Sequence, residues 1–338
     1  MDILAILGDA SRAAIGPEAA IYALAAIGLN MHFGYTGLLN FGQVGFMLVG
    51  AYGVAVAVTT FSAPLWAGVL IGIALAVALA LLLGIPTLRL RADYLAITTI
   101  AAGEILRYAY RSNFASPVTG GVYGLTRFAD PIYAINPIPA GRYGFGQLSF
   151  SERSLWIMVI SWSLVALACV LMFLLIRSPW GRVIRSVREE EDAARSLGKN
   201  VFVYRLQSLV LGGVLGAVGG MLLAAYSQAV QPDAYNPAVT FYLYTLLILG
   251  GAGRILGPVV GSVIFWFVVV CADSLLRQAI GSGLIPASLI SPTEVGAVRF
   301  ALVGAGLMLL MIYRPQGLLP SRVRQEELTH AAVAETAT

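Results

Sequence analysis

Charged side chains are scarce in this sequence. Asp, Glu, Lys and Arg make up 11% of its 338 residues, 59% are hydrophobic, and the mean hydropathy is +0.83. A soluble domain carries about 25% charged residues, so the composition excludes an ordinary soluble domain. The run from Ala19 to Leu88, 70 residues long, holds no charge at all. A membrane-spanning helix needs about 20 apolar residues, so this run alone is long enough for about three crossings.

Cysteine and histidine are equally scarce. Cys169 and Cys271 both lie in apolar runs, which predicts no disulfide framework. His32 closes an apolar run, and His330 lies in a polar tail. A metal site needs several ligands at workable spacing, and neither imidazole has companions along the chain. The sequence therefore predicts no metal and no cofactor bound by this chain.

Motifs of enzymes and of nucleotide-binding proteins are missing as well. The glycines of 250–258 lack the Lys-Ser/Thr ending of a phosphate loop and the strand that precedes one. Neither a Ser-His-Asp arrangement nor a nucleic-acid module is recognisable. The glycines of 212–220 instead give overlapping G-x-x-x-G spacings, which permit close helix approach within the chain or between subunits. We expect a protein that is not an enzyme and does not bind nucleic acid.

The long apolar runs predict an all-α polytopic membrane helix bundle with about nine transmembrane helices. A helix forms hydrogen bonds between its own backbone N–H and C=O groups, and lipid offers these groups no other partner. Segment 33–41 is short and glycine-rich, and we expect a broken or re-entrant element there. Residues 2–15 fit an interfacial helix. The predicted crossings are 18–33, 41–60, 64–83, 93–111, 154–176, 203–228, 237–253, 257–276 and 295–313.

Segment 177–205 is a compact charged stretch that holds 11 of the 38 charged residues in 29 positions. Cytoplasmic loops carry an excess of Lys and Arg. Placing this segment in the cytoplasm gives 13 Lys and Arg inside and 7 outside.

The predicted domain organisation is a transmembrane domain over 1–324 followed by a short tail. The outside loop 111–153 is long enough to form a structured cap, and the polar tail 325–338 is expected to be disordered in the cytoplasm.

The charged segment has the pattern of a short helix that docks on a soluble partner. Its basic and acidic residues recur three and four positions apart, so one helix over 182–198 would place them near one another. Small alanines would permit close approach, and a glycine would end the helix. The alternative is a solvated positive loop, which explains the arginines but not the alanine pair, the glycine or the four consecutive acids. The candidate docking residues are Arg185, Arg188, Asp192, Ala193, Ala194 and Gly198.

One predicted span contains polar residues that are candidates for a translocation pathway. Glu104 and Arg107 lie three positions apart near its outer end. Ionisable groups in a membrane usually face a partner or water, so they form either a pathway or gating pair or a structural i,i+3 pair. Thr98 and Thr99 fit the same pathway, or they bond the carbonyls of their own helix.

Asn40 and Gln43 are further pathway candidates, at a predicted helix start beside several glycines. Their uncharged amides would contact an amphipathic solute without trapping it. The alternative is N-capping by Asn40 together with close helix packing. Capping is the preferred interpretation.

Together these segments resemble the permease family of branched-chain amino-acid ABC importers, and within it the longer of the two permease subunits. DAARSLG (192–198) resembles the EAA-x-x-x-G coupling motif, with Asp in place of Glu. The chain departs from the family pattern at Asn40, where Ser is usual, and at Arg254, where a small residue is typical. The matching stretches are GLLNFGQVGFMLVGAY (37–52), LRLRADYLAITTIAAGEILR (88–107), TGGVYGL (119–125), SPWGRVIRSVREEEDAARSLGKNVFVYRL (178–206), LGGAGRILGPVVGS (249–262) and YRPQGLLP (313–320).

The resemblance implies a heteromeric importer in the bacterial inner membrane. The implied partners are a second related permease, two cytoplasmic ATPases that bind the ATP, and a periplasmic solute-binding protein. This chain would form half of the pathway and transmit force without covalent chemistry. The solute would be a branched-chain amino acid or a similar small amphipathic molecule, with urea or short amides as the alternative in the same family. The rival from another class is a self-sufficient ion-coupled secondary transporter, which would need coupling carboxylates in the bundle.

Overall fold

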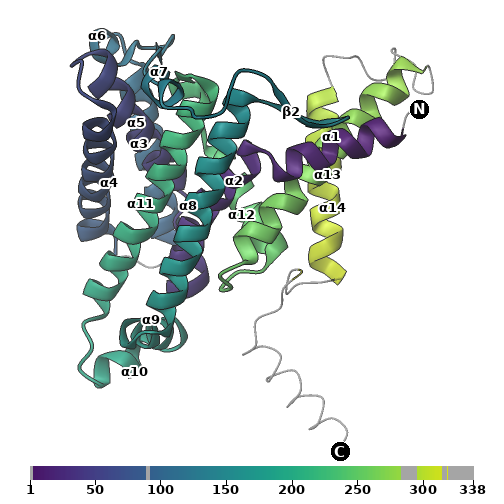
Figure 1. The fold of residues 1–338 in the computed structure, drawn as a ribbon. Helices are drawn as coiled ribbons and strands as arrows, with labels where there is room; N and C mark the ends of the chain where they lie inside the picture. Colours follow the sequence, from purple (N-terminus) through teal and green to yellow (C-terminus); the bar gives the residue numbers. More distant parts are fainter. Residues whose placement is uncertain (1–2, 89–91, 283–294, 314–317, 319–338) are drawn as a thin grey trace, which may run out of the picture.

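The computed structural model describes residues 3–88, 92–282, 295–313 and 318, and most of them are helical (Figure 1). The helices are α1 (Ile3–Ile15), α2 (Pro17–Leu29), the π-helix η1 (Asn30–Thr36), α3 (Gln43–Thr59), α4 (Leu65–Thr87), α5 (Ala92–Arg111), α6 (Ser116–Thr119), α7 (Asp130–Ala134), α8 (Glu152–Arg177), α9 (Pro179–Glu189), α10 (Glu191–Ser196), α11 (Val201–Ser227), the 3-10 helix η2 (Pro232–Tyr235), α12 (Pro237–Gly250), α13 (Gly257–Gly281) and α14 (Val295–Tyr313). The strands are β1 (Leu125–Thr126), β2 (Arg142–Phe145), β3 (Leu148–Ser151) and β4 (Ala229–Val230). β1 pairs with β4 and β2 with β3, both antiparallel. The expected disordered tail, 325–338, lies outside the described residues.

The long helices are those of a helical membrane protein. Four of them, α4, α8, α11 and α13, are long and apolar enough to cross a bilayer. α1 and the continuous α2–η1 segment pass the same test together, with a bend of 42° between them. The described residues thus support four or five crossings by length and composition, and not the predicted nine.

Two physical features account for three of the predicted crossings that fall outside this count, those of α3, α12 and α5. α3 has 17 residues and α12 has 14, and both are shorter than the roughly 20 residues that a straight span needs. α5 has 20 residues but carries Glu104, Arg107 and Arg111 in its outer half. Apolar runs in the sequence therefore extend beyond the helices that they form.

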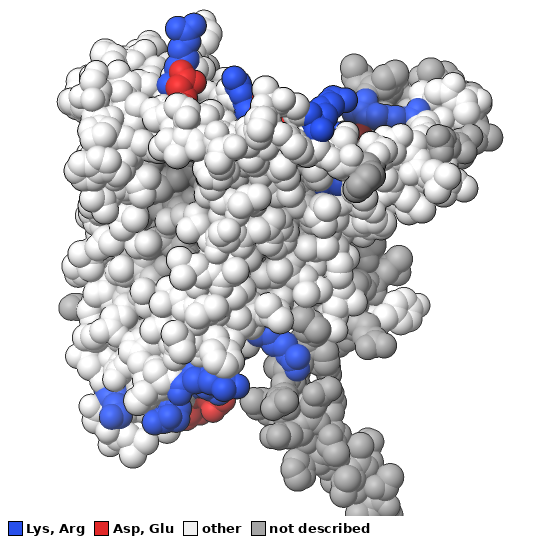
Figure 2. All heavy atoms as spheres, viewed as in Figure 1, with Lys and Arg blue, Asp and Glu red and all other residues white. Residues whose placement is uncertain are grey.

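Charged side chains gather at the two ends of the molecule on the face shown in Figure 2, with a wide uncharged band between them. α9 and α10 form the lower end in Figure 1, whereas α6, α7 and the β2–β3 hairpin lie at the upper end. Segment 111–153 supplies these upper elements, and the pairing of β1 with β4 ties it to the end of α11. An uncharged band between charged ends is the arrangement expected of a protein that crosses lipid.

The chain breaks within and just after the glycine-rich segment 33–41. The π-helical turns of η1 end at Thr36, and Gly37 adopts a left-handed backbone with φ of 74°. Irregular backbone follows as far as Gly42, and α3 begins at Gln43. π-helical segments are rare and are frequently found at functional sites. The expected broken element is therefore present as the junction between η1 and α3.

α11 packs against α2, α3 and α4 through its glycine-rich face. A Cβ atom at Gly212 would overlap the carbonyl oxygen of Gly28, and one at Gly220 would overlap the carbonyl oxygen of Met47. Backbones approach this closely only where both surfaces lack side chains. Of the two contacts left open by the sequence, the structure uses these glycines for packing within the chain.

We predict that Gly220→Ala lowers the stability of the folded protein, because the added methyl collides with backbone that cannot rotate away. Overpacking of this kind costs about 1–3 kcal/mol. The matched control is Gly304→Ala in α14, where nothing lies within 4 Å of the added Cβ. Thermal unfolding of the two detergent-solubilised variants measures the effect. Equal melting temperatures for Gly220→Ala and the wild type would contradict the packing argument.

Candidate functional site

The charged segment at the lower end folds into two short helices, and the prediction of one helix over 182–198 is wrong. Ser178 caps α9, its Oγ accepting a hydrogen bond from the Gly181 amide. Glu190 is extended, with φ of −148° and ψ of 99°, and it separates α9 from α10. The break places Glu191 and Asp192 in the first turn of α10, where the helix dipole favours negative charge. Four consecutive acids are therefore better accommodated by a new helix start than by a continuous helix.

The coupling-motif residues point in different directions from α10. Ala194 is 1% exposed and packs with Val187 and Val201. Asp192 and Ala193 are exposed, as is Leu197 at the C-terminal end of the helix. Gly198 ends the helix with φ of 74°, and its amide donates to the Arg195 carbonyl at 2.9 Å. The glycine therefore terminates the helix, and the face that α10 offers to a partner consists of its exposed residues.

Arg185 and Arg188 bind the transmembrane body and do not approach Asp192 as a single helix would have required. The Arg185 Nη2 donates to the Ile176 carbonyl at 2.7 Å. The Arg188 Nη1 donates to the Gly34 carbonyl in η1. Asp192 instead lies 3.7 Å from Arg195 within α10. The two arginines thus anchor α9 to α8 and to η1.

η1 connects α9 with the loop between α12 and α13. Asn30 donates from Nδ2 to the Arg254 carbonyl at 2.8 Å and accepts at Oδ1 from the Gly253 amide at 2.8 Å. The Gly34 carbonyl, one turn further along η1, receives the Arg188 guanidinium. η1 is therefore hydrogen-bonded both to α9 and to the α12–α13 loop.

A buried hydrogen-bond chain joins η1, the start of α3 and α11. The Asn40 Nδ2 lies 3.0 Å from His32 Nδ1 and donates to Gln43 Oε1 at 3.2 Å. The His32 Nε2 lies 3.2 Å from the Leu209 carbonyl, and the Gln43 Nε2 donates to the Gly212 carbonyl at 3.1 Å. Because Asn40 donates to Nδ1, the His32 proton must sit on Nε2 and point at a carbonyl. The hydrogen bonds run outward from the Asn40 amide group, through His32 to the Leu209 carbonyl and through Gln43 to the Gly212 carbonyl, which fixes the orientation of both amides and the imidazole.

This chain changes the interpretation of Asn40 and Gln43. Both are 0% exposed, and α3 is capped at Gly42, not at Asn40. The Asn40 Oδ1 accepts from the Gly42 amide at 2.9 Å, so its side chain stabilises the turn before the helix. In this conformation neither amide faces an open pathway. His32, taken from the sequence as a lone imidazole, is a hydrogen-bond partner of Asn40.

The two threonines of α5 differ in their surroundings. Thr98 bonds the Tyr94 carbonyl of its own helix at 2.7 Å. Thr99 is 0% exposed, donates to Ala96 at 2.9 Å and also accepts from the Phe41 amide at 3.1 Å. Thr99 therefore holds α5 against the break between η1 and α3, a contact that the local pattern did not reveal.

An ionic cluster lies at the outer end of α5. Arg107 binds Glu104 with two hydrogen bonds, of 2.9 and 2.7 Å, and reaches Asp233 of η2 at 2.6 Å. Arg111 approaches the same Asp233 carboxylate at 3.3 Å. The side chains of Arg107 and Glu104 are 11% and 26% exposed. The expected pair therefore exists, and it fastens α5 to η2 through Asp233, which lies 126 residues away in sequence.

Groups that bind metals are not clustered in the part of the chain that the structure describes. Within 3–88, 92–282 and 295–313, no set of three or more His, Cys, Asp or Glu side chains is placed to hold a metal ion. The polar groups described above serve instead to hold helices and their breaks in register.

Sequence comparisons relate this chain to known transport permeases. A family model described as "Branched-chain amino acid transport system / permease component" matches residues 15–312. The high-affinity branched-chain amino acid transport system permease protein LivM of Escherichia coli is 30% identical over 322 residues, covering 92% of this chain and 71% of that protein. A probable LivM permease of Methanocaldococcus jannaschii is 27% identical, covering 89% and 91%. The nucleoside ABC transporter permease NupC of Lactococcus lactis is 28% identical, covering 58% and 60%.

We predict that Arg107→Leu destabilises the protein more than Arg111→Leu does. The first change removes the only shared partner of Glu104 and Asp233 within the described cluster, and it costs about 1–2 kcal/mol because both carboxylates keep some contact with solvent. The Arg111 side chain is 40% exposed, and its loss costs less than about 0.5 kcal/mol. Thermal unfolding of the two variants tests this order. Equal losses would show that the cluster does not hold α5 to η2.

Proposed function

Because this chain belongs to the branched-chain amino acid transport system permease family, we propose that it forms half of the translocation pathway of an ATP-driven importer. The other half is a related permease, two cytoplasmic ATPases bind and hydrolyse the ATP, and a periplasmic binding protein delivers the solute. The protein resides in the bacterial inner membrane and binds no cofactor of its own. The match over most of the chain to permeases of this kind supports the proposal.

The proposed solute is a branched-chain amino acid or a similar small amphipathic molecule. The LivM relatives support this class. Nucleosides are the second candidate, because permeases for nucleosides and for guanosine are also similar to this chain. Urea and short amides complete the range. The importer is preferred over a secondary transporter because the family model and the LivM relatives are ABC-type transport permeases.

The proposed topology has nine crossings, which adds α3, α5, α12 and α14 to the four long helices and the α2–η1 segment. Short helices complete a crossing when neighbouring protein covers the irregular backbone beside them. The break before α3 is covered by contacts from α5 and α11, and the loop after α12 is covered by Asn30. α9 and α10 then face the cytoplasm, and the ionic cluster of α5 faces the periplasm.

One structural observation carries the coupling proposal: α10 presents exposed side chains, whereas α9 is hydrogen-bonded to the core of the bundle. α10 exposes Asp192, Ala193 and Leu197, and these residues form the proposed docking face for an ATPase. α9 binds the core through Arg188 and Gly34. Motion of the ATPase would pass from α10 to α9 and then through η1 to the centre of the bundle.

Reconstitution tests the proposed function. The chain, its paired permease, the ATPases and the binding protein are placed in liposomes, and uptake of leucine and of guanosine is measured with ATP on the ATPase side. We expect ATP-dependent uptake that requires every component, with leucine preferred. Accumulation of solute by this chain alone, driven by a proton or sodium gradient, would replace the importer with a secondary transporter.

We predict that Leu197→Glu prevents ATPase binding while the protein stays folded. Leu197 is 77% exposed on α10, so a charge there removes an apolar contact without disturbing the interior. Leu256→Glu is the matched control, since Leu256 is 58% exposed at the α12–α13 loop and lies outside the docking face. Co-purification of the ATPase with each variant measures whether the variant still binds it. Retention of the ATPase by Leu197→Glu would remove α10 from the interface.

We predict that Arg188→Ala uncouples transport from ATP hydrolysis. The variant should bind the ATPase normally, because its guanidinium faces η1, yet transport less solute per ATP hydrolysed. Arg182→Ala is the control, as Arg182 is an exposed arginine on the same helix. Parallel measurement of uptake and phosphate release gives the ratio. An unchanged ratio for Arg188→Ala would show that the bond to Gly34 transmits nothing.

A further inference from the structure

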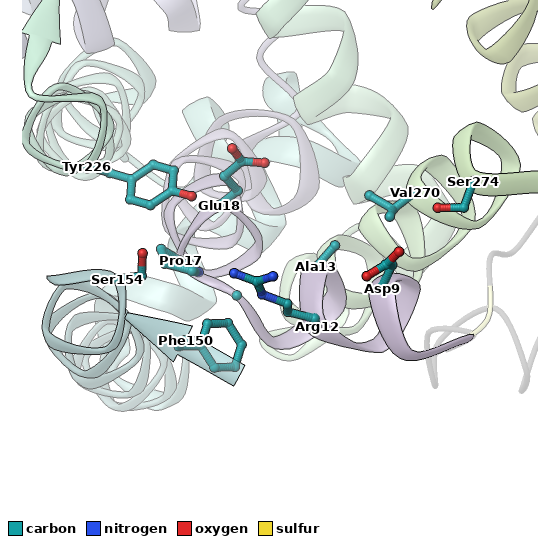
Figure 3. Close-up of a pocket in the computed structure, with 11 residues that line it drawn as sticks. Asp9, Arg12, Ala13, Pro17, Glu18, Phe150, Ser154, Tyr226, Val270 and Ser274 are labelled. Carbon is teal, nitrogen blue, oxygen red and sulfur yellow. The ribbon is translucent and has the colours of Figure 1, made fainter. Parts of the chain in front are cut away.

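A cleft of about 320 Å³ opens beside the bend between α1 and α2 (Figure 3). The start of α8, the end of α11 and the middle of α13 complete its walls. Asp9, Arg12 and Glu18 enter it from the two bent helices, and the aromatic rings of Phe150 and Tyr226 line it from the opposite side. The cleft is far from the coupling helices, and neither the docking face nor the Asn40–Gln43 network uses it.

The three charged side chains of this cleft have no mutual ion pair. Among the described residues, no ion pair within 4.0 Å involves Asp9, Arg12 or Glu18. The Arg12 guanidinium lies over the Phe150 ring, 5.4 Å from its centroid. Glu18 is half-buried in the first turn of α2, where the helix dipole stabilises a negative charge but supplies no cation. Charges of both signs therefore line one cleft without forming an ion pair with each other.

The position of α1 places this cleft at the boundary between lipid and the outer surface. α1 packs along α13 and contacts β3 at the upper end of the molecule. Leu4 and Leu7 on α1 are 81% and 45% exposed, and such residues suit a helix that lies in the interface. The Trp162 indole donates to the Ile15 carbonyl at 2.8 Å, and indoles of this kind concentrate at the headgroup level. In the proposed topology, the mouth of the cleft therefore lies at the level of the outer headgroups.

We propose that this cleft binds a zwitterion that carries a primary ammonium group near an anionic group. Arg12 binds the anion, because a guanidinium donates paired hydrogen bonds to phosphate or carboxylate oxygens. Glu18 and Asp9 accept from the ammonium, and the face of Tyr226 or Phe150 adds a cation–π contact. Two sources share this chemistry: the headgroup of an ethanolamine phospholipid in the surrounding bilayer, and a free amino acid in the periplasm.

The proposal rests on the orientation given under the proposed function but on no step of the transport cycle. A lipid-binding measurement tests it on the purified full-length chain. Native mass spectrometry compares retention of phosphatidylethanolamine, phosphatidylcholine and phosphatidylglycerol. A quaternary ammonium cannot donate to Glu18, and the glycerol headgroup has no ammonium. We expect roughly tenfold stronger retention of the ethanolamine lipid, the equivalent of one charge-assisted hydrogen bond. Displacement of that lipid by excess free leucine, with retention of radiolabelled leucine, assigns the site to free amino acids instead.

Two variants separate the two halves of the site. Glu18→Gln should abolish the preference for ethanolamine over glycerol headgroups and leave anionic lipid bound. Arg12→Gln, at an exposed position that does not endanger folding, should weaken retention of both. Asp130→Asn is the control, since Asp130 is an exposed acid on α7 outside the cleft. Equal lipid retention by the wild type and by both cleft variants, with no binding of leucine to any of them, overturns the proposal.

Discussion

The bundle depends on hydrogen bonds that polar side chains make to backbone carbonyls where water is absent. α3 begins after irregular backbone, and its approach to α11 leaves no room for solvent. His32 and Gln43 meet this constraint by donating to the Leu209 and Gly212 carbonyls, with Asn40 between them. An unpaired amide at this depth would cost several kcal/mol. The glycines of α11 and the buried amides thus have complementary roles. The glycines allow the backbones of α2 and α3 to pack closely, and the amides hydrogen-bond the polar groups that this packing buries.

Local pattern in the sequence was sufficient for features that neighbouring residues determine. The uncharged runs predicted helices, the glycine-rich segment predicted the break before α3, and the i,i+3 spacing predicted the contact between Glu104 and Arg107. The charged segment was correctly predicted to be helical, but its break at Glu190 was missed. Four adjacent acids can extend one helix or start another, and the outcome depends on how Val187 and Ala194 pack together.

Contacts between distant segments could not be read from the same patterns. Arg107 binds both Glu104 and Asp233, although Asp233 lies 126 residues away from Arg107 in the sequence. His32 and Asn40 are near in sequence, but only the turn after η1 brings their side chains together. Arg185 and Arg188 have the spacing of a docking face, and yet they bind carbonyls of the core. In each case the contact depends on a backbone carbonyl, a remote side chain or the course of an irregular turn, for which composition and periodicity carry no signal.

The buried chain of His32, Asn40 and Gln43 also has a bioenergetic consequence. A proton wire needs groups that accept a proton on one side and release one on the other. Primary amides do not do this at ordinary pH, and each of these two is held with its NH₂ group toward a fixed acceptor. His32 can relay a proton, but its two hydrogen-bond partners are the Asn40 amide and the Leu209 carbonyl, neither of which passes a proton on. No proton relay therefore runs through the hydrogen bonds that join these three side chains.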